Sequence, residues 1–226
     1  MTKPTITLLV IAKQPLPGRV KTRLVPPCTH EQAAALAAAA LADTLHAVLM
    51  APARRRVLVL DGRPGPWLPS GFDIVPQCGG PLDERLAAAF AGADGPALLI
   101  GMDTPQVTPG LLTVDWQAAD AVFGPAADGG FWALGLRVPD PALLRGVPMS
   151  TSQTGAIQRA RLLAAGLRVT DLPQLRDVDT AADAVAVARQ APQSRFAARA
   201  RELATVLSPA GPGESVFGDS ALGATA

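Results

Sequence analysis

The sequence predicts an α/β protein whose mostly parallel β-sheet is covered by helices on both faces. Short apolar runs alternate with longer segments rich in Ala and Leu, which is the pattern of strands joined by crossover helices. The first run, residues 5–12, is continuously apolar and partly β-branched, as expected of a strand buried on both sides. A chain of 226 residues is long enough for one domain with a sizeable core. We therefore expect a single domain over residues 1–207.

Each strand is predicted by a short apolar run that ends at turn residues, and each helix by apolar residues at helical spacing. In chain order, strands are expected at 5–12, 56–60, 72–76, 97–101, 121–124, 131–136 and 167–172. Between and after them, helices are expected at 31–50, 82–91, 109–118, 150–165, 180–189 and 195–207.

Capping and breaking residues support several of these boundaries. The helix at 109–118 has a proline in its first turn. The helix at 150–165 begins at a hydroxyl residue that can cap it and stops at Gly166, and Thr180 can cap the following helix. From residue 208 onward Pro, Gly, Ser and Ala dominate without periodicity, so the sequence predicts a disordered tail over 208–226.

The bulk composition excludes several classes of partner and site. The net charge is +1 and only 4% of the residues are aromatic, so a nucleic-acid surface is not expected. Cys28 and Cys78 are isolated, which excludes a disulfide framework and argues against structural zinc. The amino terminus is wrongly built for a signal peptide, and the apolar stretch 33–42 is about half of what spans a bilayer. We expect a cytoplasmic protein with no membrane span, of unknown oligomeric state.

A basic loop follows the first strand at residues 13–23. Its four cations are Lys13, Arg19, Lys21 and Arg23. Two prolines and Gly18 break regular structure there and let the backbone approach a ligand. Guanidinium forks, a lysine and backbone N–H groups hold polyphosphates well, although the spacing matches neither a Walker loop nor Gly-x-Gly-x-x-Gly. A solvated basic loop is the alternative. The position of the basic loop at a strand end favours phosphate binding over this alternative, because ligands of parallel α/β sheets bind at strand ends.

Acidic residues follow two later segments. Asp103 comes directly after the strand at 97–101, and Mg²⁺ usually takes one or two carboxylates together with phosphate oxygens and water. Its alternative is a capping aspartate in a turn. Asp177 and Asp179 stand two residues apart, so they point to one side if extended, and one of them could complete a metal site. Alternatively, Asp179 or Thr180 caps the next helix.

A glycine turn lies between the strands at 121–124 and 131–136. Gly129 and Gly130 permit close passage beneath a substrate, and Asp128 beside them could orient an acceptor or act as a base. The alternative is a plain hairpin loop. Residues 77–85 also have two interpretations: they form either a ligand loop or a capped helix start with local charge pairs.

Five of these segments together carry a resemblance to a known family. They are residues 12–24, 82–86, 101–105, 124–132 and 177–180. In order and spacing the chain resembles the bacterial DUF2064 family, also described as glycosyltransferases of the GT-A or arsenosugar-biosynthesis type, within the nucleotide-diphospho-sugar transferase superfamily. The resemblance covers about residues 5–183.

The resemblance implies a three-layer αβα sandwich of the GT-A-like kind, with a nucleotide at the end of the first strand and Asp103 as a metal ligand. In similar guanylyltransferases, acting on the molybdenum cofactor and on phospholactate, the basic loop holds the triphosphate. The sequence departs from the common family pattern at Thr104, where cysteine is frequent, and at Phe131 and Trp132, where tyrosines often stand. A single mid-chain aspartate also replaces the Asp-x-Asp that is usual in glycosyltransferases of this fold.

These observations lead to three functional hypotheses. The first is a transferase that moves a nucleotide-activated sugar to a small-molecule acceptor, with Mg²⁺ or Mn²⁺ held by Asp103 and Asp179. Lys21 would act in catalysis by stabilising the leaving group, and Asp128 would act on the acceptor. The second is a nucleotidyltransferase that joins a nucleoside triphosphate to a phosphorylated small molecule and releases pyrophosphate. The third is a nucleotide-binding protein without catalytic activity.

Overall fold

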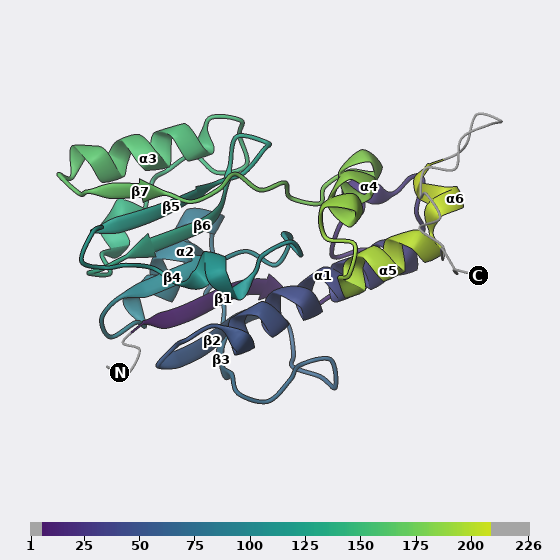
Figure 1. Cartoon of the computed structure of the whole chain (residues 1–226), viewed down its shortest axis with the longest axis horizontal. Coiled ribbons are helices and arrows are strands. Elements are labelled where there is room, and N and C mark those ends of the chain that lie inside the picture. Colours follow the sequence, from purple (N-terminus) through teal and green to yellow (C-terminus); the bar gives the residue numbers. More distant parts are fainter. Residues whose placement is uncertain (1–5, 209–226) are drawn as a thin grey trace, which may run out of the picture.

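The computed structural model describes residues 6–208, which form a seven-stranded sheet flanked by helices (Figure 1). The strands are β1 (Thr7–Lys13), β2 (Arg55–Asp61), β3 (Asp73–Pro76), β4 (Ala97–Ile100), β5 (Ala121–Pro125), β6 (Phe131–Leu136) and β7 (Val169–Asp171). The helices are α1 (His30–Met50), α2 (Leu82–Ala91), α3 (Thr154–Ala164), α4 (Ala181–Gln190), α5 (Arg195–Glu202) and α6 (Ala204–Leu207). Short 3₁₀ turns are η1 (Thr22–Leu24), η2 (Pro109–Leu112) and η3 (Pro141–Leu143).

The strand order is β3-β2-β1-β4-β6-β5-β7. Strand β6 runs antiparallel to β4 and β5, and all other neighbours are parallel. The predicted α/β class with a mostly parallel sheet is therefore confirmed. Strand β1 lies between β2 and β4, with Val10 opposite Leu58 of β2 and Ile100 of β4. The carboxyl ends of β1, β2 and β4 consequently open onto one edge of the sheet.

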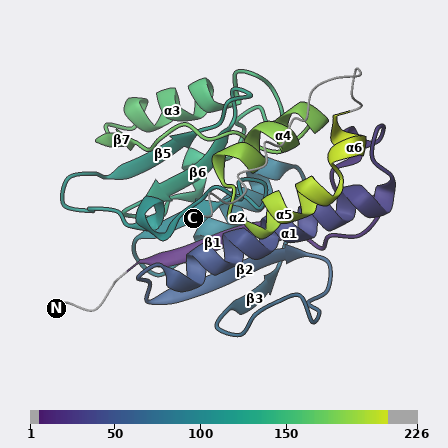
Figure 2. The ribbon, with the colours of Figure 1, turned by 45° about the vertical axis from the view of Figure 1, so that its right-hand side comes forward.

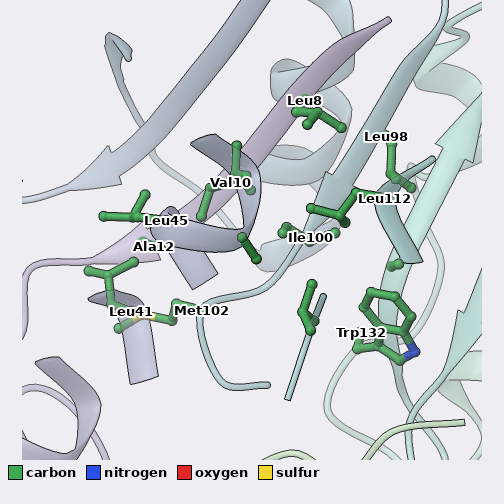
Figure 3. Close-up of a cluster of buried hydrophobic side chains, with 14 of the residues drawn as sticks. Leu8, Val10, Ala12, Leu41, Leu45, Leu98, Ile100, Met102, Leu112 and Trp132 are labelled. Carbon is green, nitrogen blue, oxygen red and sulfur yellow. The ribbon is translucent and has the colours of Figure 1, made fainter. Parts of the chain in front are cut away.

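The two faces of the sheet carry separate apolar clusters, because side chains alternate along each strand. Leu8 and Val10 of β1 share a cluster with Leu41 and Leu45 of α1, together with Ile100 (Figure 3). On the opposite face, Leu9 clusters with residues of α2 and α3, among them Leu86, Phe90 and Leu162. The sheet is thus the middle of three layers, as the resemblance implied.

Helix α1 continues beyond the sheet and supports a third cluster, which it shares with α4, α5 and α6 (Figures 1 and 2). Leu36 of α1 and Phe196 of α5 are fully buried there. Thr29 starts α1 with a capping box that it forms with Gln32. By length and composition α1 could span a membrane, with a mean hydropathy of 1.7, but 61% of that apolar window is buried inside the protein.

Three predicted helices differ from the structure. The helix expected at 109–118 is only the 3₁₀ turn η2, because Asp115 accepts the N–H of Gln117 and forms a turn instead. The helix expected from residue 150 begins at Thr154, after a bend and turn in which Ser150 has a φ of +58° and the Thr154 N–H donates to the Thr151 carbonyl. Its N-cap is Gln153, which makes no side-chain cap, so the predicted hydroxyl cap is wrong.

The last predicted helix, 195–207, is broken into α5 and α6 at Leu203. By contrast, α2 and β6 begin and end where the sequence predicts, and Thr180 caps α4 as expected. The tail expected over 208–226 lies outside the described residues, apart from Ser208.

Candidate functional site

The basic loop leaves β1 and turns back over the end of the sheet. Gln14 anchors its start, because its N–H donates to the Asp61 carbonyl and its side chain accepts from the Arg63 N–H. A Cβ on Gly62 would lie 2.4 Å from that of Gln14, so this close approach requires glycine. Gly18 then turns the chain with a φ of +74°. The loop is fixed at the edge where β1 and β2 end.

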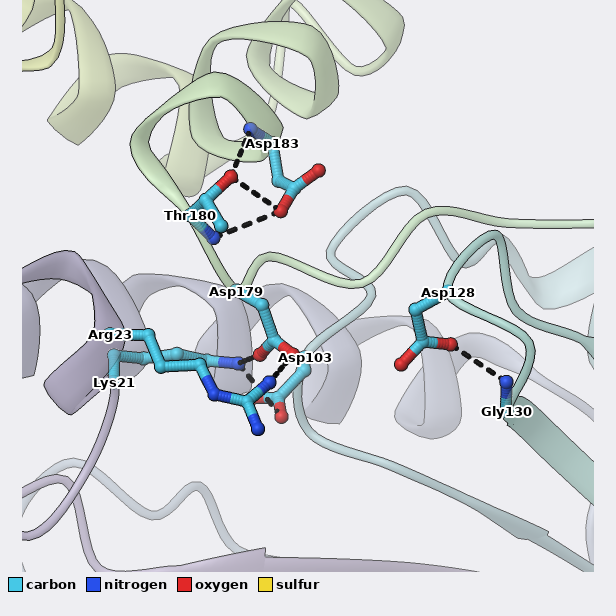
Figure 4. A network of polar contacts seen from close by, with 8 residues as sticks. All are labelled: Lys21, Arg23, Asp103, Asp128, Gly130, Asp179, Thr180 and Asp183. Atoms are coloured by element: carbon cyan, nitrogen blue, oxygen red, sulfur yellow. Dashed lines mark hydrogen bonds and ion pairs between the residues drawn. The ribbon is translucent and has the colours of Figure 1, made fainter. Parts of the chain in front are cut away.

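Lys21 connects the basic loop to two distant acids (Figure 4). Its Nζ lies 2.9 Å from Asp103 Oδ2 and 3.1 Å from Asp179 Oδ1, and its side chain is only 7% exposed. Burial lowers the pKa of Lys21, but the charges of Asp103 and Asp179 outweigh burial, and the net pKa is raised. Arg23 also pairs with Asp179, at 3.1 Å between Nη1 and Oδ2. Segments far apart in sequence are therefore joined through one buried ammonium group.

Asp103 and the segment that carries Asp177 and Asp179 lie side by side. The Val178 N–H donates to the Asp103 carbonyl, which fixes this segment against the end of β4. Thr180 and Asp183 then form a reciprocal capping box that starts α4 directly after Asp179. The prediction that Thr180 caps the helix is confirmed, and Asp179 faces the basic loop, where it pairs with Lys21.

Asp177 is partly buried and has no ion pair or hydrogen bond within residues 6–208. Burial, followed by the carboxylates of Asp103 and Asp128, raises the pKa of Asp177 to about 7, with a smaller contribution from Asp179. Lys21 opposes this shift and does not cancel it. The potential around Asp177 is therefore negative and favours an additional cation.

The turn at Asp128 packs against the segment that precedes α3. Asp128 Oδ1 accepts the Gly130 N–H at 2.8 Å, and the Gly129 carbonyl accepts the Gly155 N–H at 2.8 Å. A Cβ on Gly129 would lie 2.1 Å from the Ser152 carbonyl oxygen, so the contact between the two segments requires glycine. Because the antiparallel β5 and β6 flank this turn, it is a hairpin, and Asp128 is held rigidly at its tip.

These elements enclose a cavity of about 520 Å³ at the carboxyl ends of the central strands. Its lining includes most of the residues singled out from the sequence: Lys13, Arg19, Lys21, Arg23, Asp103, Asp128, Gly130, Asp177 and Asp179. Gly18 and Gly129 are not in the lining; they shape the turns beside it. Arg19 is 60% exposed and lies 3.6 Å from Asp61. The two regions that the sequence analysis paired, the basic loop and the mid-chain acid, do converge.

Other lining residues were not predicted. The sequence marked residues 77–85 as a possible ligand loop without selecting Gln77 or Arg85, and both line the cavity. Met149 also lines it, and Ser150, Thr151 and Thr154 contribute hydroxyl groups to the lining. They were missed because the segment was expected to be helical. The run of Pro148 and hydroxyl residues was the signal that could have indicated a loop.

The carboxylates fit a hard divalent cation as a partial ligand set. Among residues 6–208, no three His, Cys, Asp or Glu side chains form a complete metal site. Magnesium, however, is commonly held by one or two carboxylates together with substrate phosphates and water. Asp103 and Asp179 each offer oxygen donors beside the cationic loop, and burial together with neighbouring carboxylates raises the pKa of the nearby Asp177. The donor chemistry therefore suits a metal that arrives with a phosphate ligand.

The chain is similar to one described protein family and to several solved structures of the same fold. A family model described as "uncharacterized protein conserved in bacteria (DUF2064)" matches residues 34–151. No curated protein matches the chain significantly. A crystal structure from Desulfovibrio desulfuricans G20, provisionally named a nucleotide-diphospho-sugar transferase, has 26% sequence identity and a TM-score of 0.81, covering 90% of this chain and 97% of that one.

Two further solved structures share the fold at lower identity. A CMP:2-keto-3-deoxy-manno-octonic acid synthetase in complex with CTP has 14% identity and a TM-score of 0.53, covering 88% of this chain and 100% of that one. A cytidylyltransferase from Leptospira borgpetersenii serovar Hardjo-bovis (strain JB197) has 10% identity and a TM-score of 0.52, covering 89% of this chain and 94% of that one. The fold is therefore that of nucleotide-using transferases.

Proposed function

The chain belongs to the bacterial DUF2064 family, and on that premise we propose that it is a metal-dependent transferase with a nucleotide-activated sugar as donor and a small molecule as acceptor. The observation that carries the proposal is the convergence of Lys21, Asp103 and Asp179 in a cavity at the strand ends. The name of the Desulfovibrio protein, the most similar structure described above, supports the same reaction class. We expect the protein to act in the cytoplasm.

In such a transfer, different residues of the cavity bind the diphosphate, hold the metal ion and act on the acceptor. Arg19, Lys21 and Arg23 bind the diphosphate and stabilise the negative charge that develops on it as the bond to the sugar breaks. Asp103 and Asp179 would hold Mg²⁺ or Mn²⁺, which supplies Lewis-acid stabilisation to the same diphosphate when bound. Asp128, fixed by the Gly130 N–H, accepts the proton of the acceptor hydroxyl. The acceptor lies over Gly130, next to the hydroxyl groups of residues 150–154.

Nucleotidyl transfer is the second candidate, because both lower-identity structures that share the fold are named as nucleotidyl-transferring enzymes. In that reaction an oxygen of a phosphorylated acceptor attacks the α-phosphorus of a nucleoside triphosphate, and pyrophosphate leaves. The same cations would then hold the β- and γ-phosphates. A nucleotide-binding protein without turnover is the remaining hypothesis from the sequence.

The released product distinguishes these functions. The protein is incubated with Mg²⁺ or Mn²⁺, a panel of nucleotide sugars or nucleoside triphosphates, and pools of polyols or sugar phosphates. Free nucleoside diphosphate identifies glycosyl transfer, pyrophosphate identifies nucleotidyl transfer, and binding without either product identifies a non-catalytic protein.

Substitution of Asp103 tests the assigned metal ligand. Asp103→Asn should lower metal-dependent nucleotide affinity about tenfold or more, because one of very few carboxylate ligands is lost. Asp94→Asn, which changes an acid outside the cavity, is the matched control. Titration calorimetry with and without Mg²⁺ measures the difference. Unchanged affinity of Asp103→Asn in the presence of Mg²⁺ would contradict the assignment.

A further inference from the structure

Arg85 is a cavity residue that the proposed function does not use. It lies in the first turn of α2, and its Nη1 donates to Gln77 Oε1 at 3.2 Å. It forms no ion pair with any acid in the described part of the chain, and its Nε is shielded from solvent without a hydrogen-bond partner. A desolvated cationic donor without an acceptor is costly. Arg85 lines the cavity, and its Nη2 has no acceptor in the described part of the chain, so we expect a ligand group to accept from this guanidinium group.

Gln77 fixes the orientation of Arg85. Its Nε2 donates to the carbonyls of Ala12, at 2.8 Å, and Val59, at 3.1 Å, which lie near the carboxyl ends of β1 and β2. With both amide hydrogens engaged by the sheet, Oε1 faces Arg85. The strand ends thus position the guanidinium group through one side chain, which makes Gln77 a positioning residue.

The location of this pair separates it from the acceptor region. Gln77 lies over β1 and β2, whereas Asp128 lies at the β5–β6 hairpin, on the other side of β4 in the sheet order. The phosphate-binding cations and Asp103 come between, at β1 and β4. A nucleotide whose phosphates contact Lys21, with its acceptor at Asp128, therefore extends its nucleoside toward Arg85. Leu82 and Leu86 line the cavity beside Arg85 and offer the apolar surface that a flat base needs.

We propose that Arg85, oriented by Gln77, reads the base of the nucleotide and selects guanine or cytosine. A guanidinium group only donates, so it pairs best with two neighbouring acceptors. Guanine presents such a pair in O6 and N7, and cytosine in O2 and N3. Adenine and uracil present no such pair: the amino group stands beside N1 and N7 in adenine, and the N3–H lies between O2 and O4 in uracil. The inference rests on the proposed use of a nucleotide and adds the class of base.

The test compares the affinities of GDP, CDP, ADP and UDP, with pyrophosphate as a base-free probe, in the presence of Mg²⁺. The wild-type protein should bind GDP or CDP about tenfold or more tightly than ADP and UDP, the discrimination typical of a two-bond arginine contact. Arg85→Met and Arg85→Lys should both lose that preference, since lysine keeps the charge but not the planar fork. Pyrophosphate affinity should stay unchanged in both.

Two further variants sharpen the result. Gln77→Leu should reduce the preference while Arg85 is still present, which a merely structural role in the fold would not produce. Arg145→Met is the matched control. Arg145 pairs with Glu84, which lies beside Arg85 on α2, but Arg145 does not line the cavity. It should keep the wild-type preference.

The outcomes separate this inference from the proposed function. Equal binding of all four nucleotides by the wild-type protein, or an undiminished preference in Arg85→Lys, overturns base reading while the nucleotide-binding function stands. A loss of pyrophosphate affinity in both Arg85 variants that equals the loss for GDP shows that Arg85 binds phosphate, and also overturns it. Failure of the wild-type protein to bind any nucleotide overturns the proposed function itself, and this inference with it.

Discussion

Four aspartates and one buried lysine decide the electrostatics of the cavity. Lys21 compensates Asp103 and Asp179 directly, and Asp177 is left among carboxylates without a partner of its own in the described chain. Single residues of this kind can be found in a sequence by type and by their place at strand ends. Their pairing cannot, because it depends on where the chain returns: the sequence does not show that Asp179, and not Asp177, pairs with Lys21.

The raised pKa of Asp177 predicts a pH dependence of stability. The pKa is about 7 in the folded protein against an ordinary value of 3.8, so between these values the folded state keeps a proton that the unfolded chain releases. The free energy of unfolding therefore falls as the pH rises through this window. The side chain of Asp177→Asn stays neutral at every pH, so this variant should not lose stability as the pH rises. Its melting temperature should exceed that of the wild-type protein at pH 8 by more than at pH 4, measured with a metal chelator present.

A control variant checks that this effect belongs to the cavity. Asp94→Asn removes an acid away from it and should follow the wild-type pH profile. If Asp177→Asn and the wild-type protein change in parallel between pH 4 and pH 8, the aspartate is not protonated in the folded protein.

Turns and helix ends position the site at the scale of elements. Apolar runs and helical spacing predicted nearly all strands and the bounds of α2 and β6, because these features depend on local side-chain patterns. The segment 150–153 was mispredicted for a tertiary reason. It forms a bend and a turn that pack against the Asp128 turn, where the Gly155 N–H donates to the Gly129 carbonyl. No local pattern encodes that contact.

The same contact makes Gly129 a sensitive position. Gly129→Ala would strain a residue with a φ of +89° and would place its Cβ 2.1 Å from the Ser152 carbonyl oxygen. We expect a loss of about 2 kcal/mol or more in the free energy of unfolding, beyond the roughly 1 kcal/mol of the φ alone. Gly146→Ala isolates the cost of the positive φ from that of the Cβ contact, because Gly146 has a φ of +73° and open space around it. Urea unfolding measures both, and equal losses in the two variants would show that the segments are not in contact.

At the scale of the whole molecule, two packed bodies share α1. One is the sheet with its two covering layers, and the other is the helical cluster of α4, α5 and α6. Asp43 of α1 stabilises the helical cluster, because its carboxylate accepts the Phe196 N–H at 2.8 Å at the start of α5. The sequence predicted these helices but not their packing, since their apolar residues fit any neighbouring face. The ligand cavity is lined by the first body and by Asp177 and Asp179, which directly precede α4 of the second.

Ligand binding should therefore be sensed in the helical cluster. A nucleotide with Mg²⁺ that engages Lys21 and Asp179 should slow amide exchange in α4, which begins two residues after Asp179. At a ligand concentration of 100 times Kd, the folded protein gains about 2.7 kcal/mol. Hydrogen exchange with and without ligand measures the pattern. Protection confined to residues 13–23 would show that the two bodies respond independently.

The bond between Lys21 and Asp179 joins positions that are 158 residues apart. The family model spans residues 34–151, so both partners fall outside the stretch by which the chain is recognised. A fragment trimmed to that stretch would retain Asp103 and Asp128 but lose the ammonium group of Lys21 and two carboxylates, those of Asp177 and Asp179. Efforts to shorten this protein, or to transplant its pocket onto another scaffold, must carry both flanks along.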